Sequence, residues 1–312
     1  MHPELAPLTW STVLGSWSLD STSAVLILVV GLGYGWCARR ARRRGAPIKA
    51  GRVCCGGVGL GVWVLATMSV IGVYADVLFW VRALQVVLLL LVVPFFVALG
   101  GPVTVLRSAL PPGGQRRVDR LLAGRSARVL ASPLTTSVAM LGIPWLLYLT
   151  PWFAATLEHP SAAAITRILL VVVGFGYFYA RLQTDPVPRR YSQMVSLGIS
   201  VVETIGDGLL GLVLWLGPLI AVDHYLGLHR DWGPSLRLDQ TIGAGILWIL
   251  GDVLGVPFLI VLMRALSTDE KARAVEVDAE LDRVEQSPPS PGAQTTLWWE
   301  NDPQLGDRFR RR

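Results

Sequence analysis

Seven long apolar stretches alternate with short polar segments along this chain. An α-helix needs roughly 20 mostly apolar residues to cross the hydrocarbon core of a bilayer, and each stretch is close to that length. Lipid offers the backbone no hydrogen-bond partners, so each stretch predicts a membrane-spanning helix. The stretches are Ser21–Cys37, Val53–Tyr74, Val77–Leu99, Ser132–Phe153, Ala162–Tyr179, Gln193–Val222 and Thr241–Met263. The predicted fold class is therefore all-α, a polytopic integral membrane protein with a seven-transmembrane-helix bundle.

Composition agrees with this pattern. The chain has 312 residues, of which 52% are hydrophobic and only 16% charged. Soluble domains carry roughly a quarter charged residues, so a cytosolic enzyme, a disordered chain and a disulfide scaffold are all disfavoured. With no Lys or Arg before Ser21, we expect the first stretch to be a span and not a cleaved signal peptide.

The positions of Lys and Arg predict the orientation. Of the 28 basic residues, 24 fall after the first, third and fifth stretches or in the C-terminal tail. Only Arg230 and Arg237 lie in segments on the opposite side. The positive-inside rule then places the N-terminus outside and the C-terminus in the cytoplasm, as in a multi-pass plasma-membrane protein. The net charge of +6 follows from this topology and does not indicate a nucleic-acid partner. The predicted partner of the basic residues is the lipid bilayer.

Three regions follow from these boundaries. Residues 1–20 form an extracytoplasmic N-terminal segment, and residues 21–263 form the seven-helix membrane domain. Residues 264–312 form a cytoplasmic tail. Alternating charges and good helix formers predict a helix in its first part, whereas Pro, Ser and Gly predict disorder near its end.

Five charged residues inside the stretches are the strongest functional signal. A charge at the centre of a span costs roughly 2.5–3.5 kcal/mol, and such residues commonly mark a functional site. At about 1.5 Å per residue, three of them fall in the outer third of the membrane and two near the midplane. The outer three are Arg82, Arg167 and Asp207, and the inner two are Glu203 and Asp252.

Two interpretations of these charges remain open. The first is a structural ion pair of Arg82 or Arg167 with Asp207, which would fix helix packing. The second is a polar cavity open to the outer side, binding an ion or a partner group. Glu203 and Asp207 are four residues apart and share one helix face.

Four short motifs lie in register on the predicted helices. YADVLFWVRALQ begins at Tyr74, YLTPWF runs from Tyr148 to Phe153 and contains Pro151, and TDPVPRR contains Asp185 and Pro186. The fourth motif, DQTIGAGILWILGD, contains Asp239, Gln240 and Trp248. In this order and spacing the chain resembles the CtaG-type cytochrome c oxidase assembly factors of bacteria. The resemblance covers roughly residues 20–280 and implies a seven-span protein that helps place copper in the catalytic subunit of a haem–copper oxidase.

The chain departs from this family at the histidines that would hold copper. The resemblance places family histidines at Arg82, Val86, Leu169 and Asp207. The four histidines present all lie outside the apolar stretches. We therefore hypothesise that an Arg82–Asp207 pair replaces the metal and joins the third and sixth helices, since guanidinium and carboxylate groups pair in a bidentate geometry.

Copper stays possible as a cofactor on weaker grounds. His159, His224 and His229 all fall on the predicted outer side and are weak candidates for a surface copper site. An exposed loop histidine is more often ordinary polar surface. We predict no other metal site and no catalytic residues.

The sequence therefore predicts a non-enzymatic membrane factor that assists oxidase maturation at the copper-insertion step. Scaffolding is favoured over direct metal ligation, with the oxidase catalytic subunit or a copper-binding assembly factor as the partner. A small-molecule or ion transporter using Glu203, Asp207 and Asp252 is one alternative. A structural subunit of a respiratory complex is the other.

Overall fold

The computed structural model describes residues 7–183, 185–187 and 193–253, with scattered positions from 256 to 283 (256, 260, 263, 267, 274–275, 277–279 and 282–283). Within these residues all regular secondary structure is helical and no strand occurs. Contacts divide the chain into two units, Met1–Arg264 and Ala265–Arg312. The described residues of the second unit are helical, and the predicted disordered end of the tail lies outside the described residues.

The first unit is built from helices joined by short turns. The elements are α1 Trp10–Gly15, α2 Ser21–Arg43, α3 Ala50–Met68, α4 Val70–Tyr74, α5 Phe79–Val87, the π-helical turn η1 Leu88–Val92, α6 Val93–Leu99, α7 Pro102–Ala109, α8 Pro112–Leu122, α9 Arg125–Leu130, α10 Pro133–Leu149, α11 Trp152–Glu158, α12 Pro160–Leu182, α13 Gln193–Leu216, α14 Val222–Gly227, α15 Leu236–Gly245 and η2 Ile246–Leu250.

Each predicted apolar stretch has a helix of this set on it. In the described residues, four helices are long and apolar enough to cross a membrane: Ser21–Arg43, Ala50–Tyr74, Phe79–Ala109 and Pro160–Leu182. A fifth candidate is the pair α10 and α11, whose axes bend by 70° at the break between them. The seventh stretch continues from η2 into residues that the structure does not describe throughout.

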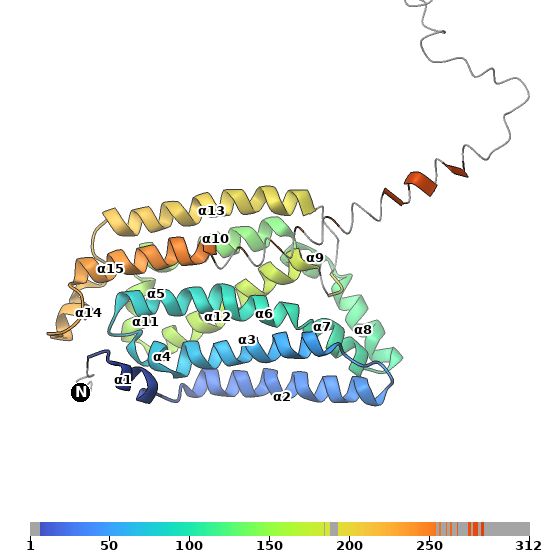
Figure 1. The fold of residues 1–312 in the computed structure, drawn as a ribbon, viewed down its shortest axis with the longest axis horizontal. Coiled ribbons are helices and arrows are strands. Elements are labelled where there is room, and N and C mark those ends of the chain that lie inside the picture. Colours follow the sequence, from blue (N-terminus) through green and yellow to red (C-terminus); the bar gives the residue numbers. More distant parts are fainter. Residues whose placement is uncertain are drawn as a thin grey trace, which may run out of the picture. The chain divides into compact units, whose positions relative to one another are not determined.

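The long helices of the first unit lie side by side as an up-and-down bundle (Figure 1). Helix α3 packs on α6, α12 packs on α6 and α10, and α13 packs on α15. The short helices α7, α8 and α9 lie at the end where α2 finishes, and α1, α4, α11 and α14 lie at the opposite end (Figure 1). The first of these ends carries the arginines of α2, α7, α8 and α9.

The α5–η1–α6 column lies in the core, because Phe79, Val86, Leu89 and Val93 are buried. Helix α2 lies at the periphery, where residues such as Val29 stay largely exposed. This contrast fits a bundle in which apolar residues also face the surroundings, as they do in lipid.

A proline accounts for the π-helical turn in the central column. Pro94 has no N–H to donate to the Leu90 carbonyl four residues earlier, so the regular helical pattern is interrupted there. The Leu90 carbonyl lies against Gly174 of α12, where an added Cβ would be only 2.0 Å from its oxygen. Glycine at position 174 therefore lets α12 approach the central column closely.

Candidate functional site

Arg82 lies buried on α5, near the end of the bundle that holds α4 and α11. Its side chain pairs with Asp76, in the turn after α4, with 3.0 Å between Nη1 and Oδ1. Its Nη2 donates to the Thr156 carbonyl in the last turn of α11 at 3.5 Å. Arg82 is 5% exposed, whereas the side chain of Asp76 is 57% exposed. The pair therefore joins a buried cation on α5 to a carboxylate at the surface.

The predicted Arg82–Asp207 ion pair is wrong. The partner of Arg82 is Asp76, six residues earlier, and among the described residues no ion pair includes Asp207. The prediction compared depths along helices, and depth does not determine the direction in which a side chain points around its helix. Asp76 lies between two apolar stretches, which is why counting charges inside the stretches overlooked it.

Arg167 also pairs with an acidic residue that lies outside the apolar stretches. Its Nη2 lies 3.1 Å from Oδ1 of Asp20. Asp20 is also the N-cap of α2, where its other carboxylate oxygen accepts the Ser23 amide at 3.1 Å. Both arginines inside the predicted spans thus pair with acids that precede a helix.

Glu203 on α13 is bound by Arg181, near the end of α12. The two carboxylate oxygens accept from the two terminal nitrogens of Arg181 at 2.8 Å and 2.9 Å. The Tyr177 hydroxyl donates to Glu203 at 2.7 Å, and the Arg181 guanidinium lies 4.1 Å from the centre of the Tyr177 ring. Arg181 also donates to the Ser137 hydroxyl of α10 at 2.5 Å. One completely buried arginine therefore joins three helices.

Arg181 is not among the predicted site residues, because it follows the fifth apolar stretch and is predicted to lie in a cytoplasmic loop. Helix α12 continues to Leu182, past the predicted boundary at Tyr179, and so carries Arg181 into the core. One signal was present in the sequence: Tyr177 and Arg181 are four residues apart and share a helix face.

Asp207 faces a small cavity between the central column, α10, α13 and η2. The cavity has a volume of about 40 Å³ and is lined largely by apolar side chains, among them Val86, Leu90 and Met140. Within the described part of the chain, no hydrogen bond to the Asp207 carboxylate is found, and Glu203 and Asp252 are the charges that act on it most directly. Asp207 is thus separate from the Arg82 cluster.

Copper, which the family resemblance implies, does not fit the corresponding positions of this chain. Val86 and Asp207 line the same cavity, but a valine offers no donor atom. The Arg82 guanidinium is bound to Asp76 and Thr156, and Leu169 is apolar. In the described ranges, no group of three His, Cys, Asp or Glu side chains is arranged to hold a metal.

The three outer histidines lie at the end of the bundle that carries Arg82. His159 is the N-cap residue of α12. The Nε2 atom of His224 lies 2.9 Å from the Asp76 carbonyl, and the Nδ1 atom of His229 lies 2.9 Å from the Gly227 carbonyl. His224 thus contacts the turn that holds Arg82, and copper at these histidines stays a prediction.

Asp239 and Gln240 each accept a hydrogen bond from a backbone amide of another segment. Oδ1 of Asp239 accepts the Trp80 amide in the first turn of α5 at 2.9 Å, where Leu78 is the N-cap residue and has no side-chain acceptor. The other oxygen lies 3.4 Å from Nη2 of Arg230. Gln240 accepts the Ile220 amide and donates to the Leu214 and Pro218 carbonyls. Both residues satisfy backbone groups that would otherwise be buried without partners.

Asp185 caps the first turn of α7 with its carboxylate. Its carboxylate accepts the Val103 amide at 2.9 Å, the Thr104 amide at 3.1 Å and the Thr104 hydroxyl at 2.5 Å. The N-cap of α7 is Gly101, in the left-handed region with φ 64° and without a side chain that could cap the helix. The neighbouring Pro186 carbonyl accepts a hydrogen bond from the Tyr179 hydroxyl.

The remaining motif residues pack helices together. Tyr148 is buried against Phe79 and Phe153, with ring centres 5.7 Å and 5.2 Å away. Pro151 is the N-cap of α11 at the bend after α10. Trp248 of η2 packs against α13 at Gly211, where an added Cβ would be 2.7 Å from the Cβ of Trp248. The motif residues therefore support the packing of the bundle.

These contacts define a class: an all-helical protein with at least four helices long and apolar enough to span a membrane, fixed by buried ion pairs and by side chains that cap distant helices. The chain belongs to the cytochrome c oxidase caa3 assembly factor family, whose profile matches residues 32–269. This confirms the resemblance drawn from the four motifs.

Curated relatives occur in mycobacteria. The chain is 26% identical over 284 residues to uncharacterized proteins of Mycobacterium tuberculosis and Mycobacterium bovis, an alignment that covers 88% of the chain and 43% of each relative. It is 25% identical over 274 residues to an uncharacterized protein of Mycobacterium leprae, covering 85% of the chain and 42% of that relative. The chain thus spans less than half the length of these relatives. No solved structure matches it significantly.

Proposed function

We propose that this chain is a seven-span plasma-membrane factor that assists the copper-insertion step in the maturation of a haem–copper oxidase, and that it does so by binding a partner. Membership of the oxidase assembly family carries the proposal. The side chains at the family's copper positions support a role in binding a partner over metal ligation. The Arg82 guanidinium is already paired, and the apolar side chains of Val86 and Leu169 cannot ligate a metal.

The proposed topology places the N-terminus outside and the C-terminus in the cytoplasm. The arginine-bearing helices α7, α8 and α9 lie at the end where α2 finishes (Figure 1), as expected if that end faces the cytoplasm. The end with Asp76, His159 and His224 would then face outward, which is the side where a partner carrying copper would be met.

The proposed partner is either the oxidase catalytic subunit or a copper-binding assembly factor. The outer end offers the exposed Asp76 carboxylate and the half-buried His224 ring, which contacts the Asp76 carbonyl. The Asp76 carboxylate is held in place by the buried Arg82. A preformed polar rim of this kind suits binding better than catalysis, and we propose no enzymatic activity.

Deletion of the gene tests the proposal. The oxidase purified from the deletion strain should contain less copper per haem than the wild-type enzyme, and the wild-type gene should restore it. Normal copper and normal haem in the deletion strain would remove the proposed role.

The family assignment favours an assembly role over the two alternatives. Transient association with the oxidase during its assembly is the expected behaviour. Stable co-purification at fixed stoichiometry would instead indicate a structural subunit. Substrate-dependent flux in proteoliposomes that requires Asp207 would indicate a transporter.

A further inference from the structure

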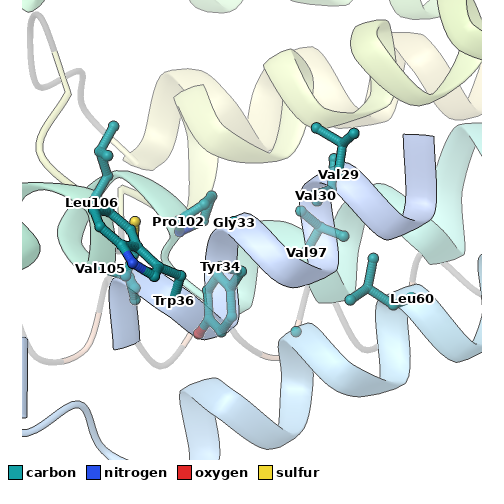
Figure 2. Close-up of a pocket in the computed structure, with 12 residues that line it drawn as sticks. Val29, Val30, Gly33, Tyr34, Trp36, Leu60, Val97, Pro102, Val105 and Leu106 are labelled. Carbon is teal, nitrogen blue, oxygen red and sulfur yellow. The ribbon is translucent and has the colours of Figure 1, made fainter. Parts of the chain in front are cut away.

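A large apolar groove runs along α2, and none of the residues of the Arg82, Glu203 and Asp207 sites line it. It has a volume of about 400 Å³ and lies between α2, α3, α6 and α7 (Figure 2). Its lining includes Val30, Tyr34, Trp36, Leu60, Val97 and Leu106. The Tyr34 hydroxyl donates to the Gly100 carbonyl at 2.8 Å, so this hydroxyl is already engaged. The groove therefore suits an aliphatic ligand.

The groove is open to the surroundings of the bundle. Val29 and Trp36 on its rim are 64% and 57% exposed. The lining residues of α2 run from Val29 to Cys37, a length of about 12 Å at 1.5 Å per residue. An elongated apolar ligand can therefore lie along α2, parallel to the helix and to the lipid chains around a spanning helix.

An arginine stands at the basic end of this groove. Arg40 lies one turn beyond Trp36, with its guanidinium carbon 5.2 Å from the centre of the Trp36 ring. Its Nε donates to the Ala109 carbonyl at 3.2 Å, which anchors the side chain to the end of α7. Among the described residues, none accepts a hydrogen bond from its two terminal nitrogens. Arg43 follows in the same last turn of α2.

This combination matches one ligand chemistry. An arginine held in place with its terminal N–H groups unused is suited to a phosphate, which guanidinium groups bind through paired hydrogen bonds. Basic residues at the cytoplasmic end of a span attract anionic headgroups, each contributing about 1 kcal/mol. An aliphatic groove that ends at such an arginine is complementary to a lipid with a negative headgroup.

We propose that the groove binds one acyl chain of an anionic phospholipid of the cytoplasmic leaflet, with the lipid phosphate on Arg40. A second copy of the chain is a poorer occupant, because pairing two copies through this face would bring two sets of arginines from the end of α2 together. The proposal rests on the proposed orientation in the membrane and is independent of the role in oxidase maturation.

Native mass spectrometry of the full chain tests the proposal. The protein is reconstituted in nanodiscs with equal amounts of phosphatidylglycerol and phosphatidylcholine and then released into mild detergent. We expect one retained phosphatidylglycerol per chain, preferred about tenfold over phosphatidylcholine. Arg40→Gln should remove the preference, whereas Arg42→Gln on the same helix should keep it.

A pair of glycines provides the steric control. Gly33 lines the groove and Gly35 does not, and an added Cβ at either position meets no atom within 4 Å. Gly33→Leu should therefore fold and lose the retained lipid, while Gly35→Leu should fold and keep it. Equal lipid retention by the two variants would overturn the proposal. A wild-type chain without bound lipid, equal retention of both lipids, a bound neutral isoprenoid or a dimer through this face would overturn it as well.

Discussion

Arg181 and Glu203 form a buried bidentate ion pair between α12 and α13, with donor–acceptor distances of 2.8 Å and 2.9 Å. The arginine is completely buried, and it also contacts Ser137 on α10 and Tyr177 one turn earlier on α12. A charge in this position is tolerated only because its partners satisfy it. The pair therefore determines how three helices of the bundle fit together.

Removal of one partner should destabilise the protein more than removal of both. We expect Arg181→Leu or Glu203→Leu to lower the free energy of unfolding by about 3–5 kcal/mol, because each leaves a buried charge without compensation. The double variant should lose less than the sum of the two. Unfolding in detergent micelles measures all three values.

The exposed pair of Arg107 and Asp119 is the matched control. It is also bidentate, at 2.9 Å and 3.0 Å, but its side chains are almost half exposed. Arg107→Leu should cost no more than about 1 kcal/mol. If Arg181→Leu were as mild as this control, the buried pair would not organise the bundle.

A double-mutant cycle can identify the true partner of Arg82. Arg82→Leu and Asp76→Asn should couple by about 1 kcal/mol, a modest value because the Asp76 side chain is more than half exposed. Arg82→Leu and Asp207→Asn should be additive within about 0.5 kcal/mol. Coupling to Asp207 but not to Asp76 would restore the metal-replacement hypothesis and contradict the observed contacts.

Much of the helical architecture was predictable, because each apolar stretch has one low-energy backbone solution in lipid. The motif around Asp239 and the YLTPWF motif also indicate the family from the sequence alone. These features are local in sequence, so periodicity, composition and short spacing are enough to reveal them.

The pairing of charges was not predictable in the same way. Arg82 and Asp207 lie at similar depth, yet Arg82 turns toward Asp76 while Asp207 faces the cavity with Val86. Arg181 was assigned to a loop because the apolar stretch ends before the helix does. Direction around a helix axis and the true end of a helix depend on tertiary packing, which a single sequence does not record.

Asp185 should protect the start of α7 from hydrogen exchange. Its carboxylate accepts the Val103 and Thr104 amides, and loss of a helix cap costs about 0.5–2 kcal/mol. Asp185→Ala should therefore speed exchange at these two amides relative to the rest of the bundle. Asp231→Ala, at an exposed position in the loop after α14, is the control, and equal exchange in both variants would refute the capping role.

Gly243 and Gly245 on α15 should respond differently to the same substitution. A Cβ at Gly243 would lie 2.5 Å from the Phe79 ring, whereas one at Gly245 meets no atom within 4 Å. We expect Gly243→Ala to cost about 1–3 kcal/mol through overpacking. Gly245→Ala should be neutral or stabilising, because alanine favours a helix more than glycine does. Thermal unfolding of the two variants checks this, and equal midpoints would contradict the close approach of α15 to α5.

The most direct test of the central claim is the copper content of the oxidase after complementation of the deletion strain. The complementing chain would carry Asp207→Asn together with His159→Gln and His229→Gln, which removes the candidate copper ligands that lie outside the proposed partner-binding rim. If the chain acts by binding a partner, this variant, present at the wild-type level, should restore copper per haem as fully as the wild-type chain. Failure of the variant where the wild-type chain succeeds would show that these side chains handle the metal directly and would contradict the account.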